Sequence, residues 1–103
     1  MKVYNKLVRD RIPEIIEQTG KKVEYQIVED NGKVIRLLEE KLLEEWQEYK
    51  ESGSVEEIAD LLEVLFAIAE RKGISRDELL ELARKKAEER GGFRRGVVLI
   101  GTY

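Results

Sequence analysis

The sequence contains no cysteine and no histidine. Without cysteine there is no disulfide framework and no thiol chemistry. Without histidine the chain lacks both the usual zinc ligand and the usual general base. Any acid–base chemistry therefore depends on carboxylates, lysine, tyrosine or water activated by a metal ion.

Long apolar runs and an excess of basic charge are missing as well. No stretch approaches the roughly 20 apolar residues of a membrane span, and the first residues lack the apolar run of a signal peptide. The 19 basic residues face 22 acidic ones, a net charge of −3, whereas a nucleic-acid polymer is bound by a dominantly basic surface. We expect a cytoplasmic protein that binds neither a membrane nor a nucleic-acid polymer.

The spacing of apolar residues predicts a single domain, residues 1–103, with a mainly α-helical fold. Four helices are predicted, two of them long and antiparallel, over residues 11–18, 34–51, 54–72 and 75–90. Short peripheral strands are predicted over residues 23–28 and 96–101, because apolar and polar residues alternate in the first and apolar residues fill the second. The helix 54–72 is apolar almost all round, which is more than one partner helix can cover. We therefore expect dimerisation to complete the core.

Four carboxylates are placed symmetrically about the break at Gly53. If this break is the turn of a helical hairpin, Glu48 lies level with Glu57, and Glu45 lies level with Asp60 one turn deeper. Four converging acids repel one another unless a cation lies between them. Oxygen ligands without histidine or cysteine point to a hard divalent ion, Mg²⁺ ahead of Ca²⁺ or Mn²⁺.

A solvated helix face is the simpler explanation for acids in so acidic a chain. Glu45 does not fit it, because it falls in the middle of an apolar stripe that includes Leu38 and Leu42, where an unpaired carboxylate is costly. For Glu57 another explanation stays open, a capping box with Ser54.

The last predicted helix carries the opposite charge at its end. Lys86 and Arg90 occupy the positions that continue the apolar stripe of Leu79 and Leu82. Charge–dipole stabilisation at a helix C-terminus, or a lysine stem lying along apolar surface, explains such cations. A phosphate clamp, extended by Arg94 and Arg95, is the functional alternative. Beside a carboxylate–metal cluster it suggests a phosphate-ester or phosphoanhydride substrate.

Three segments together resemble a known superfamily. Residues 41–48 followed by residues 57–62 resemble the EExxE…ExxD signature of the all-α NTP pyrophosphohydrolases, the MazG-like proteins, which include phosphoribosyl-ATP pyrophosphohydrolase. The opening 4–13 and the ending 86–93 resemble a compact subgroup thought to remove noncanonical nucleotides. Only eight residues separate Glu48 from Glu57, fewer than in many relatives, so the helices here turn sooner.

The resemblance implies a MazG-like helical bundle completed as a homodimer or a dimer of dimers. It implies hydrolysis of a nucleoside triphosphate to the monophosphate and pyrophosphate with Mg²⁺, for which Mn²⁺ is a possible substitute. The implied metal ligands are Glu45, Glu48, Glu57 and Asp60. The implied catalytic residues are Glu45 and Glu44, the latter either behind the ligands or as the base that orients water. The implied substrate and phosphate contacts are Asn5, Lys6, Arg9, Lys86, Arg90 and Arg94.

Two other functions remain open at this point. A phosphoribosyl-ATP pyrophosphohydrolase performs similar chemistry on one specific nucleotide. A dimeric helical interaction module without enzymatic activity would carry the same acids as solvated surface residues.

Overall fold

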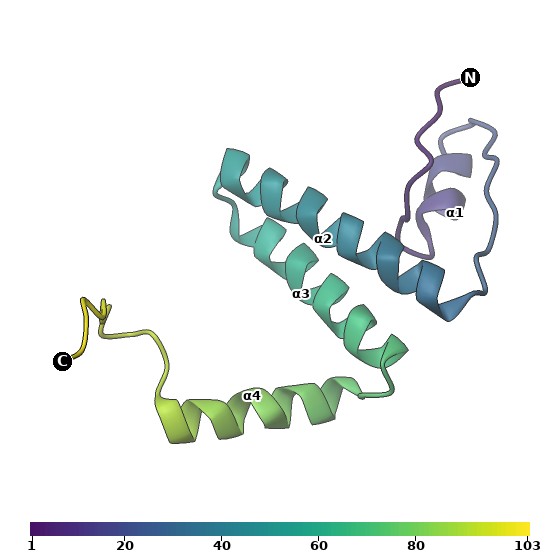
Figure 1. Ribbon diagram of the computed structural model, residues 1–103. Coiled ribbons are helices and arrows are strands. Elements are labelled where there is room, and N and C mark those ends of the chain that lie inside the picture. Colours follow the sequence, from purple (N-terminus) through teal and green to yellow (C-terminus); the bar gives the residue numbers. More distant parts are fainter.

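The computed structural model describes residues 1–103 as four α-helices without a β-strand (Figure 1). The helices are α1 (Ile12–Glu17), α2 (Asn31–Ser52), α3 (Val55–Arg71) and α4 (Arg76–Arg90). The prediction of a mainly helical fold is confirmed. None of the four helices combines the length and the apolarity needed to cross a bilayer.

The prediction of strands at residues 23–28 and 96–101 is wrong. A strand is stable only when a neighbouring strand accepts and donates its backbone hydrogen bonds. These two segments lie at opposite ends of the molecule (Figure 1) and make no backbone hydrogen bond to each other. The apolar residues of the second segment, such as Leu99 and Ile100, are exposed.

Side-chain caps determine where the long helices begin and end. Asp30 caps α2 by accepting a hydrogen bond from the backbone N–H of Lys33 at 3.0 Å, so α2 begins three residues before the predicted Val34. The Asn31 side chain donates to the backbone carbonyl of Arg71 at 3.0 Å. This bond ties the start of α2 to the end of α3. At the start of α4, the Ser75 hydroxyl accepts a hydrogen bond from the backbone N–H of Glu78, and the Glu78 carboxylate accepts one from the backbone N–H of Ser75, which forms a capping box.

The helices α2 and α3 form an antiparallel hairpin whose turn is Gly53. This residue ends α2 in the left-handed conformation, with φ of 65°, which glycine adopts without a steric penalty. The buried centre of the hairpin is small and consists of Val34, Leu38 and Val64. Leu7, from the N-terminal segment, packs against this centre. Leu7 therefore anchors the N-terminal segment to the hairpin.

The helix α4 contacts the hairpin only near its own start. The Arg76 guanidinium pairs with Glu63 at 3.2 Å and lies 4.2 Å from the centre of the Phe66 ring. Beyond this point α4 leads away from the hairpin (Figure 1), and none of its residues is buried. In the single chain Leu79 is half-buried, whereas Leu82, Lys86 and Arg90 farther along the same stripe are exposed.

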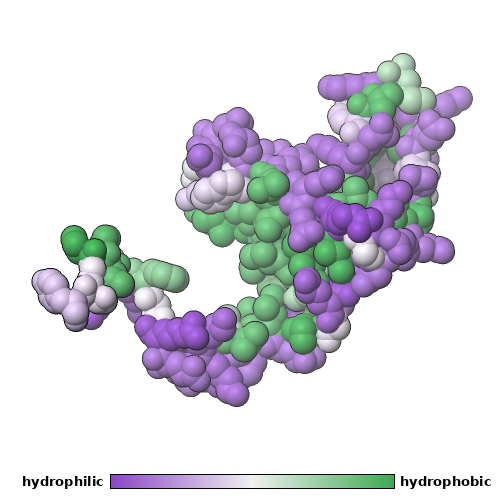
Figure 2. All heavy atoms as spheres, viewed as in Figure 1, coloured by the Kyte–Doolittle hydropathy of each residue, from purple (hydrophilic) through white to green (hydrophobic).

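Much apolar surface remains uncovered in the single chain. Only six of the 103 residues are buried. The radius of gyration is 17.8 Å, against about 13 Å for a compact domain of this length. Apolar side chains form a continuous exposed surface over the hairpin (Figure 2). The larger exposed side chains of α3 are Val55, Ile58, Leu62 and Leu65.

Candidate functional site

The hairpin brings acids of α2 and α3 together near its turn. One carboxylate oxygen from each of Glu45, Glu57 and Asp60 lies within 4.8 Å of the other two. The turn at Gly53 sets this register, because it places the last turns of α2 beside the first turns of α3. We call Glu45, Glu57 and Asp60 the acidic cluster.

Two oxygens of the acidic cluster are buried without a hydrogen-bond partner. Glu45 is 7% exposed, and its Oε2 atom accepts no hydrogen bond. The Oε2 atom of Glu57 is likewise buried and unpaired. Buried polar atoms are almost always paired, since an unpaired one loses its hydration without compensation. Two such oxygens in one cluster are therefore suited to bind a cation.

The capping-box explanation for Glu57 does not hold in this structure. The Ser54 side chain accepts its hydrogen bond from the backbone N–H of Glu56 at 3.2 Å. The backbone N–H of Ser54 donates to the hydroxyl of Ser52 at 3.1 Å, so the Glu57 side chain does not reach back to it. The Glu57 carboxylate is therefore free to join the acidic cluster.

Glu48 lies beside the acidic cluster on an exposed position of α2. Its carboxyl has a raised pKa, first because of a hydrogen bond with the Glu45 carboxyl, then because of desolvation and repulsion by Glu45 and Glu57. Burial, followed by repulsion from Asp60 and Glu45, raises the pKa of Glu57. When Glu45 and Glu48 are both ionised, no proton is left for the hydrogen bond between them, and only their repulsion remains. A cation that attracts both would remove this repulsion when all the acids are ionised.

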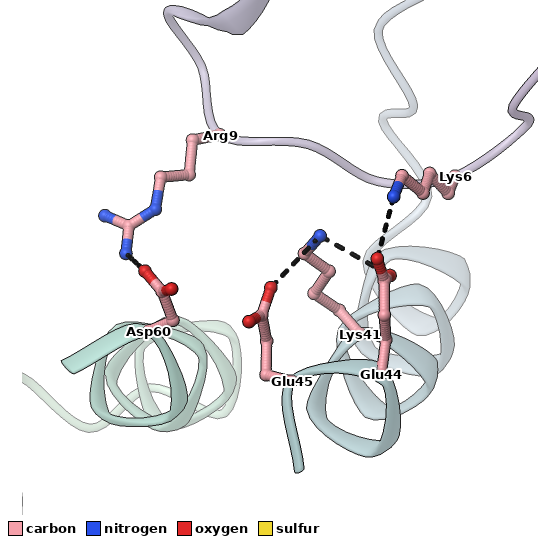
Figure 3. Close-up of polar contacts among 6 residues, drawn as sticks. All are labelled: Lys6, Arg9, Lys41, Glu44, Glu45 and Asp60. Carbon is pink, nitrogen blue, oxygen red and sulfur yellow. Dashed lines mark hydrogen bonds and ion pairs between the residues drawn. The ribbon is translucent and has the colours of Figure 1, made fainter. Parts of the chain in front are cut away.

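Three cations surround these acids (Figure 3). Lys6 lies 2.7 Å from Glu44, and Arg9 lies 2.6 Å from Asp60. Lys41 lies between two acids, 3.4 Å from Glu44 and 3.3 Å from Glu45. The side chains of Lys6 and Arg9 come from the N-terminal segment and reach the hairpin across 38 and 51 sequence positions.

The hydrogen bond from Lys6 is the main reason why the pKa of Glu44 is lowered. A carboxylate with a lowered pKa is a weak proton acceptor.

Lys41 is a site residue that the sequence analysis did not select. It precedes Glu44 and Glu45 by three and four positions, the spacing that brings side chains together on one helix face. Its side chain is only 16% exposed, which is unusual for lysine unless it is paired. The helical spacing was the signal that could have identified it.

A cleft of about 440 Å³ opens beside the acidic cluster, between residues 7–10 and the helices α2 and α3. This volume is within the range of small-molecule sites. Val34, Leu38 and Val64 supply apolar wall, while acids and cations supply the polar part. The polar lining of the cleft includes two residues of the acidic cluster, Glu45 and Asp60, and the cations Arg9 and Lys41.

The remaining residues selected from the sequence do not meet in one place. Asn5 is exposed, with φ of 47°, and its side chain makes no hydrogen bond. Lys86, Arg90 and Arg94 lie on α4 and after it, are exposed, and form no ion pair with the acids of the hairpin. In the single chain the phosphate clamp and the carboxylates are therefore separate.

Comparisons with protein-family models, with curated proteins and with solved structures find no match to this chain.

The raised pKa values of Glu48 and Glu57 predict how the stability of the metal-free protein depends on pH. The folded state keeps these protons to a higher pH than the unfolded state, so folding loses stability as pH rises above the ordinary glutamate pKa of 4.5. In EDTA, the double variant Glu48→Gln with Glu57→Gln should gain stability over the wild type as pH rises from about 4 to 8. Chemical denaturation at each pH measures the difference.

Glu39→Gln serves as the control, because Glu39 is exposed on α2 and has no ion pair. Its stability relative to the wild type should change little over the same pH range. A double variant whose advantage does not grow with pH would contradict the repulsion derived from the structure.

Proposed function

We propose that this protein is a Mg²⁺-dependent nucleoside triphosphate pyrophosphohydrolase, which converts noncanonical nucleoside triphosphates to the monophosphate and pyrophosphate. The observation that carries the proposal is the pair of buried, unpaired oxygens on Glu45 and Glu57, close to Asp60 and beside a cleft. The resemblance of residues 41–48 and 57–62 to the EExxE…ExxD signature supports the same reaction. With a substrate from the nucleotide pool, we expect the protein in the cytoplasm.

The residues of the acidic cluster fit a magnesium ion. All the donors are carboxylate oxygens, the ligands preferred by hard divalent cations. Glu45, Glu57 and Asp60 would hold Mg²⁺, with Glu48 as a fourth ligand at the turn, and Mn²⁺ would be accepted at the same oxygens. When bound, Mg²⁺ supplies positive charge against the triphosphate and lowers the pKa of water.

The other residues of the site position the substrate and its counter-charges. In the proposed reaction, a water oxygen bonds to the α-phosphorus and the water proton passes to solvent water, while the bond from that phosphorus to the bridging oxygen breaks and pyrophosphate leaves with the bond's electron pair. Lys41 stays fixed between Glu44 and Glu45, where it limits repulsion and holds the Glu45 side chain in place. Three cations, Arg9, Lys41 and Arg71, line the cleft. Of these, Arg9 would contact an incoming phosphate, while Lys6 pairs with Glu44 behind the site.

We further propose that two copies of the chain pack through the exposed apolar surface of the hairpin, as a homodimer or a dimer of dimers. The small buried centre and the exposed side chains of α3 support this assembly. A phosphate-binding role for Lys86, Arg90 and Arg94 depends on it, because these cations do not meet the acids of their own chain.

The reaction is tested by pyrophosphate release from a panel of canonical and damaged nucleoside triphosphates, with Mg²⁺ and with EDTA. We expect release only with Mg²⁺, together with a monophosphate product. Asp60→Asn should lower the rate by at least about 100-fold, because loss of a metal ligand exceeds the typical effect of a residue behind the ligands. Glu39→Gln should keep the wild-type rate.

The other outcomes separate the alternatives. Phosphoribosyl-ATP is assayed beside this panel, and release from it alone would replace the proposed function with that of a phosphoribosyl-ATP pyrophosphohydrolase. If no substrate is hydrolysed and Mg²⁺ leaves the melting temperature unchanged, the chain is an interaction module, because a ligand bound only by the native state raises its stability.

The assembly is tested by light scattering on the purified protein. We expect two or four times the chain mass of 12.0 kDa. The double variant Leu62→Lys with Leu65→Lys places two charges on the exposed face of α3 and should give the mass of one chain with unchanged helix content. A wild type that runs as a single chain would refute the proposed assembly.

A further inference from the structure

Arg9 forms an ion pair with Asp60, one of the three residues of the acidic cluster. Its Nη2 atom lies 2.6 Å from Oδ1 of Asp60, and the guanidinium makes no other hydrogen bond within the chain (Figure 3). Arg9 and Asp60 both line the cleft. A divalent ion bound by the cluster would therefore compete with Arg9 for Asp60.

The backbone at Arg9 is held on both sides, while its side chain is not. Lys6 pairs with Glu44 at 2.7 Å, and Leu7 packs against the buried centre of the hairpin. On the other side, the carbonyl of Arg9 accepts a hydrogen bond from the backbone N–H of Ile12 at 3.0 Å, at the start of α1. The Arg9 side chain is 55% exposed. It can therefore change its partner while its backbone remains beside the cleft.

Lys41 differs from Arg9 in this respect. Its side chain is 16% exposed and contacts Glu44 and Glu45 together, so releasing it would leave a buried cation unpaired. The Arg9–Asp60 pair is partly exposed, and such pairs are weak and easily exchanged. Of these two cations, Arg9 is the one suited to move.

We propose that Arg9 exchanges partners during the reaction cycle, an inference that rests on the proposed function. In the metal-free protein it neutralises Asp60. When Mg²⁺ binds the acidic cluster, the guanidinium leaves Asp60 and binds a phosphate of the nucleotide in the cleft, for which its planar donors are well matched. Arg9 thus weakens the binding of metal alone and strengthens the binding of phosphate once the metal is bound.

Opposite effects on two affinities test the exchange. Calorimetry measures the binding of Mg²⁺ alone, and then the binding of inorganic pyrophosphate at saturating Mg²⁺. Arg9→Met should bind Mg²⁺ about two- to five-fold more tightly, since an exposed competing pair has been removed. It should bind pyrophosphate about ten-fold more weakly, since a hydrogen bond to a charged group has been lost.

Two further variants control for charge and folding. Arg9→Lys keeps a cation opposite Asp60, so its Mg²⁺ affinity should match the wild type while pyrophosphate binding weakens. Arg11→Met removes a neighbouring arginine that pairs only with Glu14, and both affinities should stay at the wild-type values. Circular dichroism should show the same helix content for all four proteins.

The exchange is overturned if Arg9→Met binds Mg²⁺ no more tightly than the wild type, or if its affinity for pyrophosphate is unchanged. Either result leaves the proposed function standing when the wild type binds Mg²⁺ and releases pyrophosphate from a nucleotide. A wild type that does not bind Mg²⁺ overturns the metal site itself, and the exchange with it.

Discussion

The packing of α2 against α3 is the constraint on which the rest of this structure depends. The left-handed turn at Gly53 joins the helices at one end, and the bond from Asn31 to the Arg71 carbonyl ties them at the other. These two contacts set the register of the two helices. This register places Glu45 opposite acids that lie in the first turns of α3.

The same register concentrates negative charge near the turn, where few buried apolar contacts stabilise the hairpin. The buried centre of the hairpin is near the Val34 end, whereas the acidic cluster lies toward the turn. Lys41 and Arg9 offset part of the repulsion through ion pairs, but two carboxylate oxygens remain buried and unpaired. If the acidic cluster binds a cation as proposed, the ion would offset this cost.

The sequence predicts those features that depend on local signals. Ser75 with Glu78 marks the start of α4, and the break at Gly53 correctly separates the two long helices. The meeting of Glu45 with Asp60 follows from helical geometry once the turn is located. The same helical geometry could also have identified Lys41, because its partners are three and four positions away.

Features that depend on distant partners were not predictable in this way. Alternation at residues 23–28 resembles a strand, but a strand also needs a neighbour, which the pattern does not specify. The apolar stripe of α4 implies a buried face, yet the surface that would cover it is not in the single chain. Arg9 reaches Asp60 across 51 positions, and no local spacing indicates which acid it meets.

The most direct test of this account is a crystal structure of the protein grown with Mn²⁺, in which anomalous scattering locates the ion. The account predicts an anomalous peak bound by Glu45, Glu57 and Asp60, with the Arg9 guanidinium displaced from Asp60. Absence of a peak at these carboxylates, with the Arg9–Asp60 pair intact at saturating Mn²⁺, would contradict it.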